Sequence, residues 1–185
     1  MPPDGNRRLK FCIGLKGDGM VAQFVRGLRT GDQIVMQGPA GSLTFRDFSR
    51  NAFFVASGLG VIPFASLAPD MLARGYRGKI HLLFGLEDED SVFYFDRFGQ
   101  LASLDPNFKF TPLLASPKSH WPGEVGRLTT YLDIHDSYHR GDLIYLCGDP
   151  EVVRRCRELL LSKGHKPEDI KTEVFAKRDA LAAAA

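Results

Sequence analysis

Five apolar runs, separated by segments with helical periodicity, most strongly constrain how this chain can fold. The runs cover residues 53–56, 80–84, 108–114, 143–147 and 170–175. Apolar side chains recur at helical spacing in the intervening segments 61–72, 93–104, 128–138 and 151–163. Strands that are apolar on both sides are typical of a parallel sheet with helices on both faces. We therefore expect an α/β fold with a five-stranded parallel sheet, wound in the common order 3-2-1-4-5.

The first 48 residues have a different pattern. Short extended segments are expected at 9–15, 33–37 and 42–45, with a short helix within 19–29. Short strands with short connections are typical of antiparallel or barrel-like structure. The expected organisation is a partial antiparallel β-barrel over residues 1–48, an α/β nucleotide-binding domain over 49–178, and a tail over 179–185.

Composition narrows the class of protein. With 24 Lys and Arg against 22 Asp and Glu, the net charge of +2 does not favour nucleic acid as a partner. The three cysteines form no C-x-x-C pair, which disfavours a disulfide framework, a zinc knuckle and an iron–sulfur cluster. No apolar stretch approaches the length of a membrane span, and the first residues lack an apolar leader. We therefore expect a cytoplasmic protein.

A metal site has one weak indication. His135 and His139 are four residues apart in a segment that is expected to be helical, a spacing that can bind a metal. The sequence offers no convincing third ligand and no H-E-x-x-H pattern, so a solvated helix face is the favoured interpretation. We expect no metal.

The position of a ligand site follows from the expected strand order. In open parallel sheets, ligands bind beyond the carboxyl ends of the strands, where the strand order reverses. Here that point lies between the first strand, followed by the loop 57–63, and the fourth, followed by the loop 147–150. The first loop, Ser57-Gly-Leu-Gly-Val-Ile-Pro63, combines glycines with a helix N-terminus, which suits a diphosphate. It lacks the third glycine of the usual fingerprint, so a tight strand–helix turn remains the alternative.

The second loop, Cys147-Gly-Asp-Pro150, also has two interpretations. A thiol near a helix N-terminus can be activated, although a half-buried, inert cysteine is the commoner case. No obvious His–Asp partner accompanies Cys147, which disfavours a cysteine hydrolase and favours contact with a flat ligand ring. The acidic run 87–90 follows the second strand, either as a solvated loop or near the ribose of an adenosine.

Four ordered motifs carry a family resemblance. Residues 38–45 (GPAGSLTF), 57–63 (SGLGVIP), 143–153 (LIYLCGDPEVV) and 172–175 (TEVF) resemble, in order and spacing, the ferredoxin–NADP reductase family. The cytochrome b5 reductase-like and oxygenase-reductase members are the most similar in type. The resemblance implies a flavin-binding barrel followed by a nicotinamide-nucleotide domain, with this chain beginning halfway through the barrel.

The resemblance also implies roles for individual residues. The diphosphate would be held by Ser57, Gly58, Gly60 and Pro63. Cys147 and Gly148 would lie near the nicotinamide, with Pro150 shaping the turn. Glu173 and Phe175 match the C-terminal positions near the nicotinamide and the flavin ring, so Cys147 and Glu173 are the candidate catalytic residues. An edge strand with one buried Phe is the structural alternative for the last two.

Two departures concern the flavin. The R-x-Y-[ST] motif, which holds the flavin ring and its phosphate in the family, occurs nowhere in this chain. The later G-x-x-[ST] motif aligns with Gly19–Ala22, where alanine replaces the hydroxyl. FAD is therefore expected from the family, but little or none is predicted to stay with this chain. Either the chain is a fragment, or a partner chain completes the barrel, or FAD is held weakly.

The expected function is that of an NAD(P)H-dependent flavin oxidoreductase, or its nucleotide-binding part. The resemblance implies hydride transfer from nicotinamide to FAD and onward electron transfer to a partner protein. The alternative is a flavin-free nucleotide-binding regulatory or assembly module without catalysis. NADH is preferred to NADPH in this interpretation, because Glu87 would repel a 2′-phosphate and accept bonds from a free ribose. Ser116 and Lys118 could instead accept that phosphate.

Overall fold

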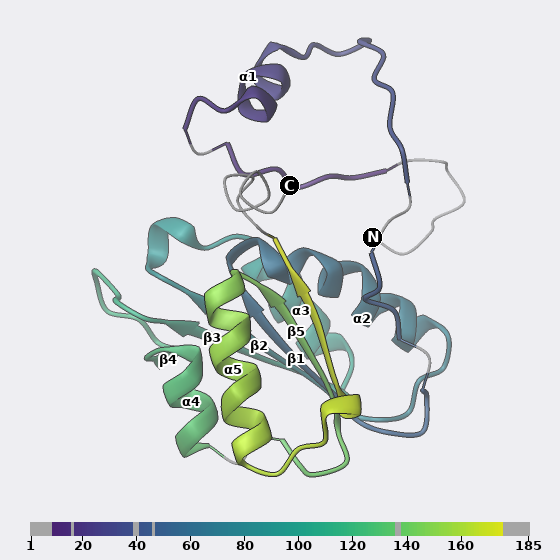
Figure 1. The fold of residues 1–185 in the computed structure, drawn as a ribbon, viewed down its shortest axis with the longest axis vertical. Coiled ribbons are helices and arrows are strands. Elements are labelled where there is room, and N and C mark those ends of the chain that lie inside the picture. Colours follow the sequence, from purple (N-terminus) through teal and green to yellow (C-terminus); the bar gives the residue numbers. More distant parts are fainter. Residues whose placement is uncertain (1–8, 16, 39–40, 46, 136–137, 176–185) are drawn as a thin grey trace, which may run out of the picture.

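A six-stranded parallel sheet forms the centre of the structure. The computed structural model of the chain describes residues 9–15, 17–38, 41–45, 47–135 and 138–175. The strands lie in the order β4-β3-β2-β1-β5-β6, and every pair is parallel (Figure 1). Their bounds are Ala52–Ser57 (β1), Ile80–Leu86 (β2), Phe108–Leu114 (β3), Glu124–Val125 (β4), Leu143–Gly148 (β5) and Ile170–Val174 (β6). The predicted fold class and the order of the five apolar runs are confirmed, and β4 is a short additional strand beside β3.

Helices cover both faces of the sheet. On one face lie α2 (Ile62–Ala73) and α3 (Phe95–Leu104), and on the other α4 (Leu128–Ile134) and α5 (Pro150–Ser162) (Figure 1). Alternation along each strand separates two cores. Phe54 packs in the cluster with Phe64 of α2, whereas its neighbour Phe53 packs in the cluster with Leu132 of α4. This two-sided burial explains why the strands are apolar throughout. The described residues also contain three short 3-10 turns: Gly58–Val61 (η1), Glu89–Ser91 (η2) and Pro167–Asp169 (η3).

The N-terminal segment corrects one expectation. Its helix, α1 (Met20–Gly27), forms within the expected range. The described residues of 9–15, 33–37 and 42–45 form no strand, although all three were expected to do so. A strand needs ladder hydrogen bonds to a neighbour, and within the described residues the sheet has no strand before Ala52. Residues 9–15 and 33–37 run beyond the carboxyl edge of the sheet as extended chain around α1, whereas residues 41–45 lead back towards β1 and end in the core at Phe45 (Figure 1).

The end of this segment packs on the α/β unit. Phe45 is buried, and its ring makes edge-on contacts with Tyr76 at 5.3 Å and Phe48 at 5.5 Å between centroids. Phe45 and Phe48 therefore pack on the core of the α/β unit although they precede the expected boundary between residues 48 and 49. That boundary remains a prediction, and the tail 179–185 lies outside the described residues.

The expected helix over 128–138 ends early. His135 is the C-cap of α4 and has an extended backbone conformation, with φ −112° and ψ 124°. His135 and His139 therefore do not lie one turn apart on a helix, which removes the spacing argument for a metal. Within the described ranges, no group of three or more His, Cys, Asp or Glu side chains could hold a metal ion. Within the same ranges, no helix is both long and apolar enough to cross a membrane.

Candidate functional site

The two predicted loops meet at the centre of the carboxyl edge. β1 and β5 are neighbours with Ala56 opposite Cys147, so the loops that follow them lie side by side. A Cβ atom added to Gly60 would lie 2.0 Å from the carbonyl oxygen of Cys147, and one added to Gly148 would lie 2.1 Å from Ser57 Oγ. The sequence predicts that these glycines allow close approach of a ligand. The structure shows that they first of all allow the two loops to approach each other.

Hydrogen bonds connect the same loops. The backbone N–H of Asp149 donates to Ser57 Oγ at 2.9 Å. The hydroxyl of Ser57 keeps its own proton for a further acceptor. Gly148 has φ +140°, which side-chain-bearing residues rarely adopt, and Gly58 has φ +50° with open space at the position that a Cβ atom would take. The junction between β1 and β5 is therefore fixed by contacts within the chain.

The two helices that begin at this junction differ in their N-termini. Asp149 caps α5, because its Oδ1 accepts from the backbone N–H groups of Glu151 at 2.9 Å and Val152 at 3.3 Å. Its carboxylate and the acidic Glu151 make this helix start unfavourable for a phosphate. The η1–α2 turn has no side-chain cap and no acidic residue in its first turn, and Pro63 occupies an early α2 position. Of the two loops, only η1–α2 suits a diphosphate.

The candidate catalytic residues are neighbours in the sheet. Cys147 on β5 lies opposite Glu173 on β6. Burial raises the pKa of the Cys147 thiol to about 12, with a further contribution from the Glu173 charge. The thiol is therefore protonated at neutral pH, which argues against a cysteine hydrolase. Glu173 is half-buried, with its Oε2 3.1 Å from the Cβ position of Gly41, and Phe175 is 47% exposed.

The ends of β2 and β3 bring Glu87 and Ser116 together. The N–H of Ser116 donates to the carbonyl of Glu87 at 2.8 Å, and both residues are exposed. The sequence offers Glu87 as a contact to the ribose of an adenosine or as a solvated residue, and Ser116 as an acceptor of a 2′-phosphate, and the fold makes the two residues neighbours. Gly19, by contrast, precedes α1 in the N-terminal segment, where α1 has no side-chain cap. Ala22, which stands at the family's hydroxyl position, is buried.

A network between the loops after β2 and β3 was not foreseen. Lys118 Nζ forms ion pairs with Asp88 at 2.7 Å and with Asp90. Glu89 accepts bonds from the backbone N–H groups of Lys118 at 2.8 Å and Ser119 at 2.9 Å, and from the Ser119 hydroxyl at 2.8 Å. These bonds lower the pKa of Glu89 to about 2, and the two aspartates raise the pKa of Lys118. The sequence feature that could have indicated this network is the single lysine after β3, Lys118, together with the four acidic residues 87–90 after β2.

The fold and the site define a class of protein, and a family model matches the same residues. The uncapped turn at the switch point of a parallel sheet is typical of nucleotide-binding α/β domains. Residues 54–158 match the family model of the oxidoreductase NAD-binding domain, which covers more than half of the chain. The chain therefore belongs to this family, and the expected likeness to ferredoxin–NADP reductases is confirmed.

The chain spans about half the length of the curated relatives that it matches. The toluate 1,2-dioxygenase electron transfer component of Pseudomonas putida is 28% identical over 170 residues, covering 91% of this chain and 50% of that protein. The phenol hydroxylase P5 protein of Acinetobacter pittii is 32% identical over 152 residues, covering 80% and 43% respectively. The ferredoxin NADP+ reductase of Neisseria gonorrhoeae, solved with FAD and NADP, has a TM-score of 0.74 and 21% identity, covering 86% of this chain and 71% of that one.

Proposed function

We propose that this chain is the nucleotide-binding part of an NAD(P)H-dependent electron-transfer reductase. The observation that carries the proposal is the uncapped η1–α2 turn, held against β5 at the point where the strand order reverses. A diphosphate at this turn meets the positive end of α2 without a competing carboxylate such as the one that caps α5. The electron-transfer relatives support the same assignment.

Each predicted residue has a role in this arrangement. The nicotinamide nucleotide supplies a hydride when it is bound, and the chain supplies position. Ser57, Gly58 and Gly60 form the diphosphate turn, with Pro63 in the helix start. Gly148 and Pro150 shape the neighbouring loop, and the neutral Cys147 would lie near the nicotinamide. Glu173 and Phe175 lie at the adjacent edge strand, where they would border the ring.

The described residues do not build a site for FAD. The family implies this cofactor, yet residues 9–15, 17–38 and 41–45 form no barrel strand, and Ala22 offers no hydroxyl at the motif position. These residues alone therefore do not fit the flavin. We propose that a chain or segment completing the barrel would hold the flavin and that a further protein accepts the electrons. The second candidate, favoured by the same observation, is a flavin-free nucleotide-binding module without catalysis.

A charge substitution tests the diphosphate site. Leu59 lies in the η1 turn and is 36% exposed, so a carboxylate at this position adds a like charge without filling the core. Leu59→Asp should weaken NADH binding at least about tenfold. Leu59→Asn introduces a side chain of nearly the same shape as Asp but without its charge, and its affinity for NADH should stay within about threefold of the parent chain. Calorimetric titration of both variants gives the ratio. Equal affinities for the two variants would place the diphosphate elsewhere.

A flavin measurement separates the two candidate functions. The purified chain should release little or no FAD on denaturation, because the motif residues that hold its phosphates are absent. Added FAD should restore NADH-dependent ferricyanide reduction only if the chain can still present the nicotinamide to a flavin. Such activity with added FAD favours the reductase part over the regulatory module, whereas stoichiometric bound FAD contradicts the prediction of weak holding.

Cofactor preference follows from the network after β2 and β3. We propose that NADH is preferred, because Lys118 is already neutralised by Asp88 and Asp90 and is not free to meet a 2′-phosphate. The exposed Glu87 adds repulsion beside Ser116. A bound phosphate would have to break two ion pairs for one new contact. This arrangement favours the free ribose of NADH.

Releasing Lys118 tests this preference. The double variant Asp88→Asn/Asp90→Asn should narrow the NADH-to-NADPH affinity ratio at least about fivefold, and the gain in NADPH binding should fall with added salt. Adding Lys118→Ala should cancel that gain. Asp70→Asn, which breaks the Asp70–Arg74 ion pair on α2, is the matched control and should leave the ratio unchanged. A parent chain that prefers NADPH would overturn the proposal.

A further inference from the structure

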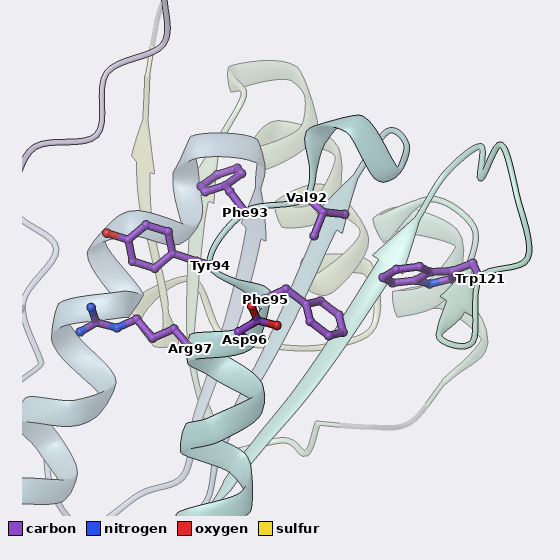
Figure 2. Close-up of a pocket in the computed structure, with 7 residues that line it drawn as sticks. All are labelled: Val92, Phe93, Tyr94, Phe95, Asp96, Arg97 and Trp121. Atoms are coloured by element: carbon purple, nitrogen blue, oxygen red, sulfur yellow. The ribbon is translucent and has the colours of Figure 1, made fainter.

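An aromatic pocket opens at the start of α3, outside both predicted nucleotide loops. It has a volume of about 510 Å³ and is lined by Val92, Phe93, Tyr94, Phe95, Asp96, Arg97 and Trp121. Figure 2 shows Asp96 at the beginning of α3, between Tyr94 and Arg97 on one side and Phe95 and Trp121 on the other. Six of these residues are consecutive, and Trp121 comes from the loop between β3 and β4. No lining residue belongs to the loops 57–63 or 147–150.

The rings of the pocket are fixed by their neighbours. Phe95 makes edge-on contacts with Phe110 at 5.5 Å and Trp121 at 5.7 Å, measured between ring centroids. Phe93 is edge-on to the buried Phe84 at 5.6 Å. These contacts hold the rings in place before any partner arrives, which lowers the entropic cost of binding. The aromatic side chains themselves are half-buried, so part of each ring remains accessible.

Some polar groups of the pocket already have partners within the chain, and one has no ion pair among the described residues. Arg97 lies over the Tyr94 ring at 5.6 Å and donates to the carbonyl of Ala65 at 3.3 Å. The Trp121 indole N–H donates to the carbonyl of Glu124 at 3.1 Å, so the indole presents only its π surface to a ligand. Asp96 is exposed, and within the described residues no ion pair neutralises it. The available features are therefore aromatic surface and one carboxylate.

We propose that this pocket binds an arginine side chain presented by a partner protein. A guanidinium is attracted by the negative face of an aromatic ring and pairs in two-pronged fashion with a carboxylate. The chain already shows the first mode internally, in Arg97 over Tyr94 and in Arg74 over Phe48 at 5.0 Å. Aromatic residues with a central charged group are also the composition found at protein–protein hot spots.

Charge complementarity selects this occupant over others. The acidic residues 87–90 precede the pocket along the chain, and of the four only Asp88 and Asp90 have an ion pair, both with Lys118, within the described residues. A phosphate or a carboxylate ligand would be repelled by Asp96, and the cation of the pocket, Arg97, is already engaged by the Tyr94 ring and the Ala65 carbonyl. The whole chain carries a net charge of +2, so this acidic corner differs in sign from the molecule as a whole. A basic side chain is the complementary group.

The single tryptophan makes the proposal measurable. Trp121 is the only one in the sequence, so its indole N–H gives one NMR signal that reports on the pocket. The probe is the blocked peptide acetyl-Gly-Arg-Gly-amide, titrated into the full chain. Its citrulline analogue has the same shape without the charge. The arginine peptide should shift the Trp121 signal in a saturable manner with millimolar affinity, and the citrulline peptide should bind at least about fivefold more weakly.

Variants locate the binding within the pocket. Asp96→Asn should weaken the arginine peptide at least about fivefold, and Phe95→Leu, which keeps an apolar side chain but removes the ring, should weaken it about threefold. Glu168→Gln, an exposed acid of η3 without an ion pair among the described residues, is the control and should have no effect. Circular dichroism confirms that each variant is folded. A non-saturable shift, equal binding of the two peptides, an unaffected Asp96→Asn, or competition with NADH would each overturn the proposal.

Discussion

Two parts of the chain have similar apolar character and opposite exposure. Leu9, Phe11, Ile13 and Leu15 alternate as a strand should, yet their side chains are 41–70% exposed. In β1, five of six residues are buried between two neighbouring strands. The difference lies in the neighbours rather than in the segments themselves. An apolar pattern gives a segment the tendency to extend, but only an adjacent strand satisfies its backbone and covers its side chains.

The largest loss of stability is expected from a substitution at the junction between the loops after β1 and β5. Gly60→Val should lower the free energy of unfolding by about 3 kcal/mol or more, because the new side chain collides with the backbone of Cys147. Nucleotide binding should be lost with it. Urea denaturation gives the free energy, and calorimetry gives the affinity for NADH.

Gly58 provides the control for that substitution. It has φ +50° but open space at its Cβ position, so Gly58→Ala should cost only about 1 kcal/mol. A Gly60→Val chain as stable as Gly58→Ala would show that the two loops are not packed as closely as described. The pair therefore distinguishes close packing from backbone conformation alone.

A pair of phenylalanines tests the comparison between the two parts directly. Phe45→Ala removes a ring that is 6% exposed and packed on Tyr76, so it should cost about 3 kcal/mol. Phe11→Ala removes a ring that is 61% exposed and should change stability by less than about 0.5 kcal/mol. Thermal and urea unfolding measure both. A cost at Phe11 similar to that at Phe45 would mean that the N-terminal segment is packed in solution.

The sequence predicted the parts of the molecule that follow from the order of the apolar runs. The parallel strand order follows from apolar runs separated by helices, and the meeting of the loops 57–63 and 147–150 follows from that order. The expected strands of the N-terminal segment failed because periodicity does not tell whether a neighbouring strand exists. The cap on α5 was not predicted, although Asp149 followed by Pro150 and Glu151 is a pattern typical of a helix start. The aromatic pocket has no such signal, because Trp121 joins residues 92–97 only through the fold.

The smallest expected effect on stability comes from the cysteines, whose thiols also differ in exposure between the two parts of the chain. Cys12 in the N-terminal segment is exposed, whereas Cys147 and Cys156 in the α/β unit are buried. Burial raises the pKa of each buried thiol to about 12, from an ordinary value of 9.0. At pH values between about 9 and about 12, these thiols lose their protons in the unfolded chain and keep them in the folded chain. The contribution of each thiol to stability is therefore fully present below pH 9 and is lost as the pH rises towards 12.

This pH dependence is measurable as a difference between two proteins. From about pH 8 to about pH 10, each buried thiol should lower the free energy of unfolding by about 1 kcal/mol. Buried tyrosines add to the total in the same direction, so the decisive quantity is the change in Cys156→Ala compared with the parent chain. That variant should lose about 1 kcal/mol less over the same interval, whatever its starting stability. Thiol labelling at about pH 8 should modify Cys12 alone in the folded chain, and rapid labelling of Cys147 would contradict the closed junction on which the proposed nucleotide site depends.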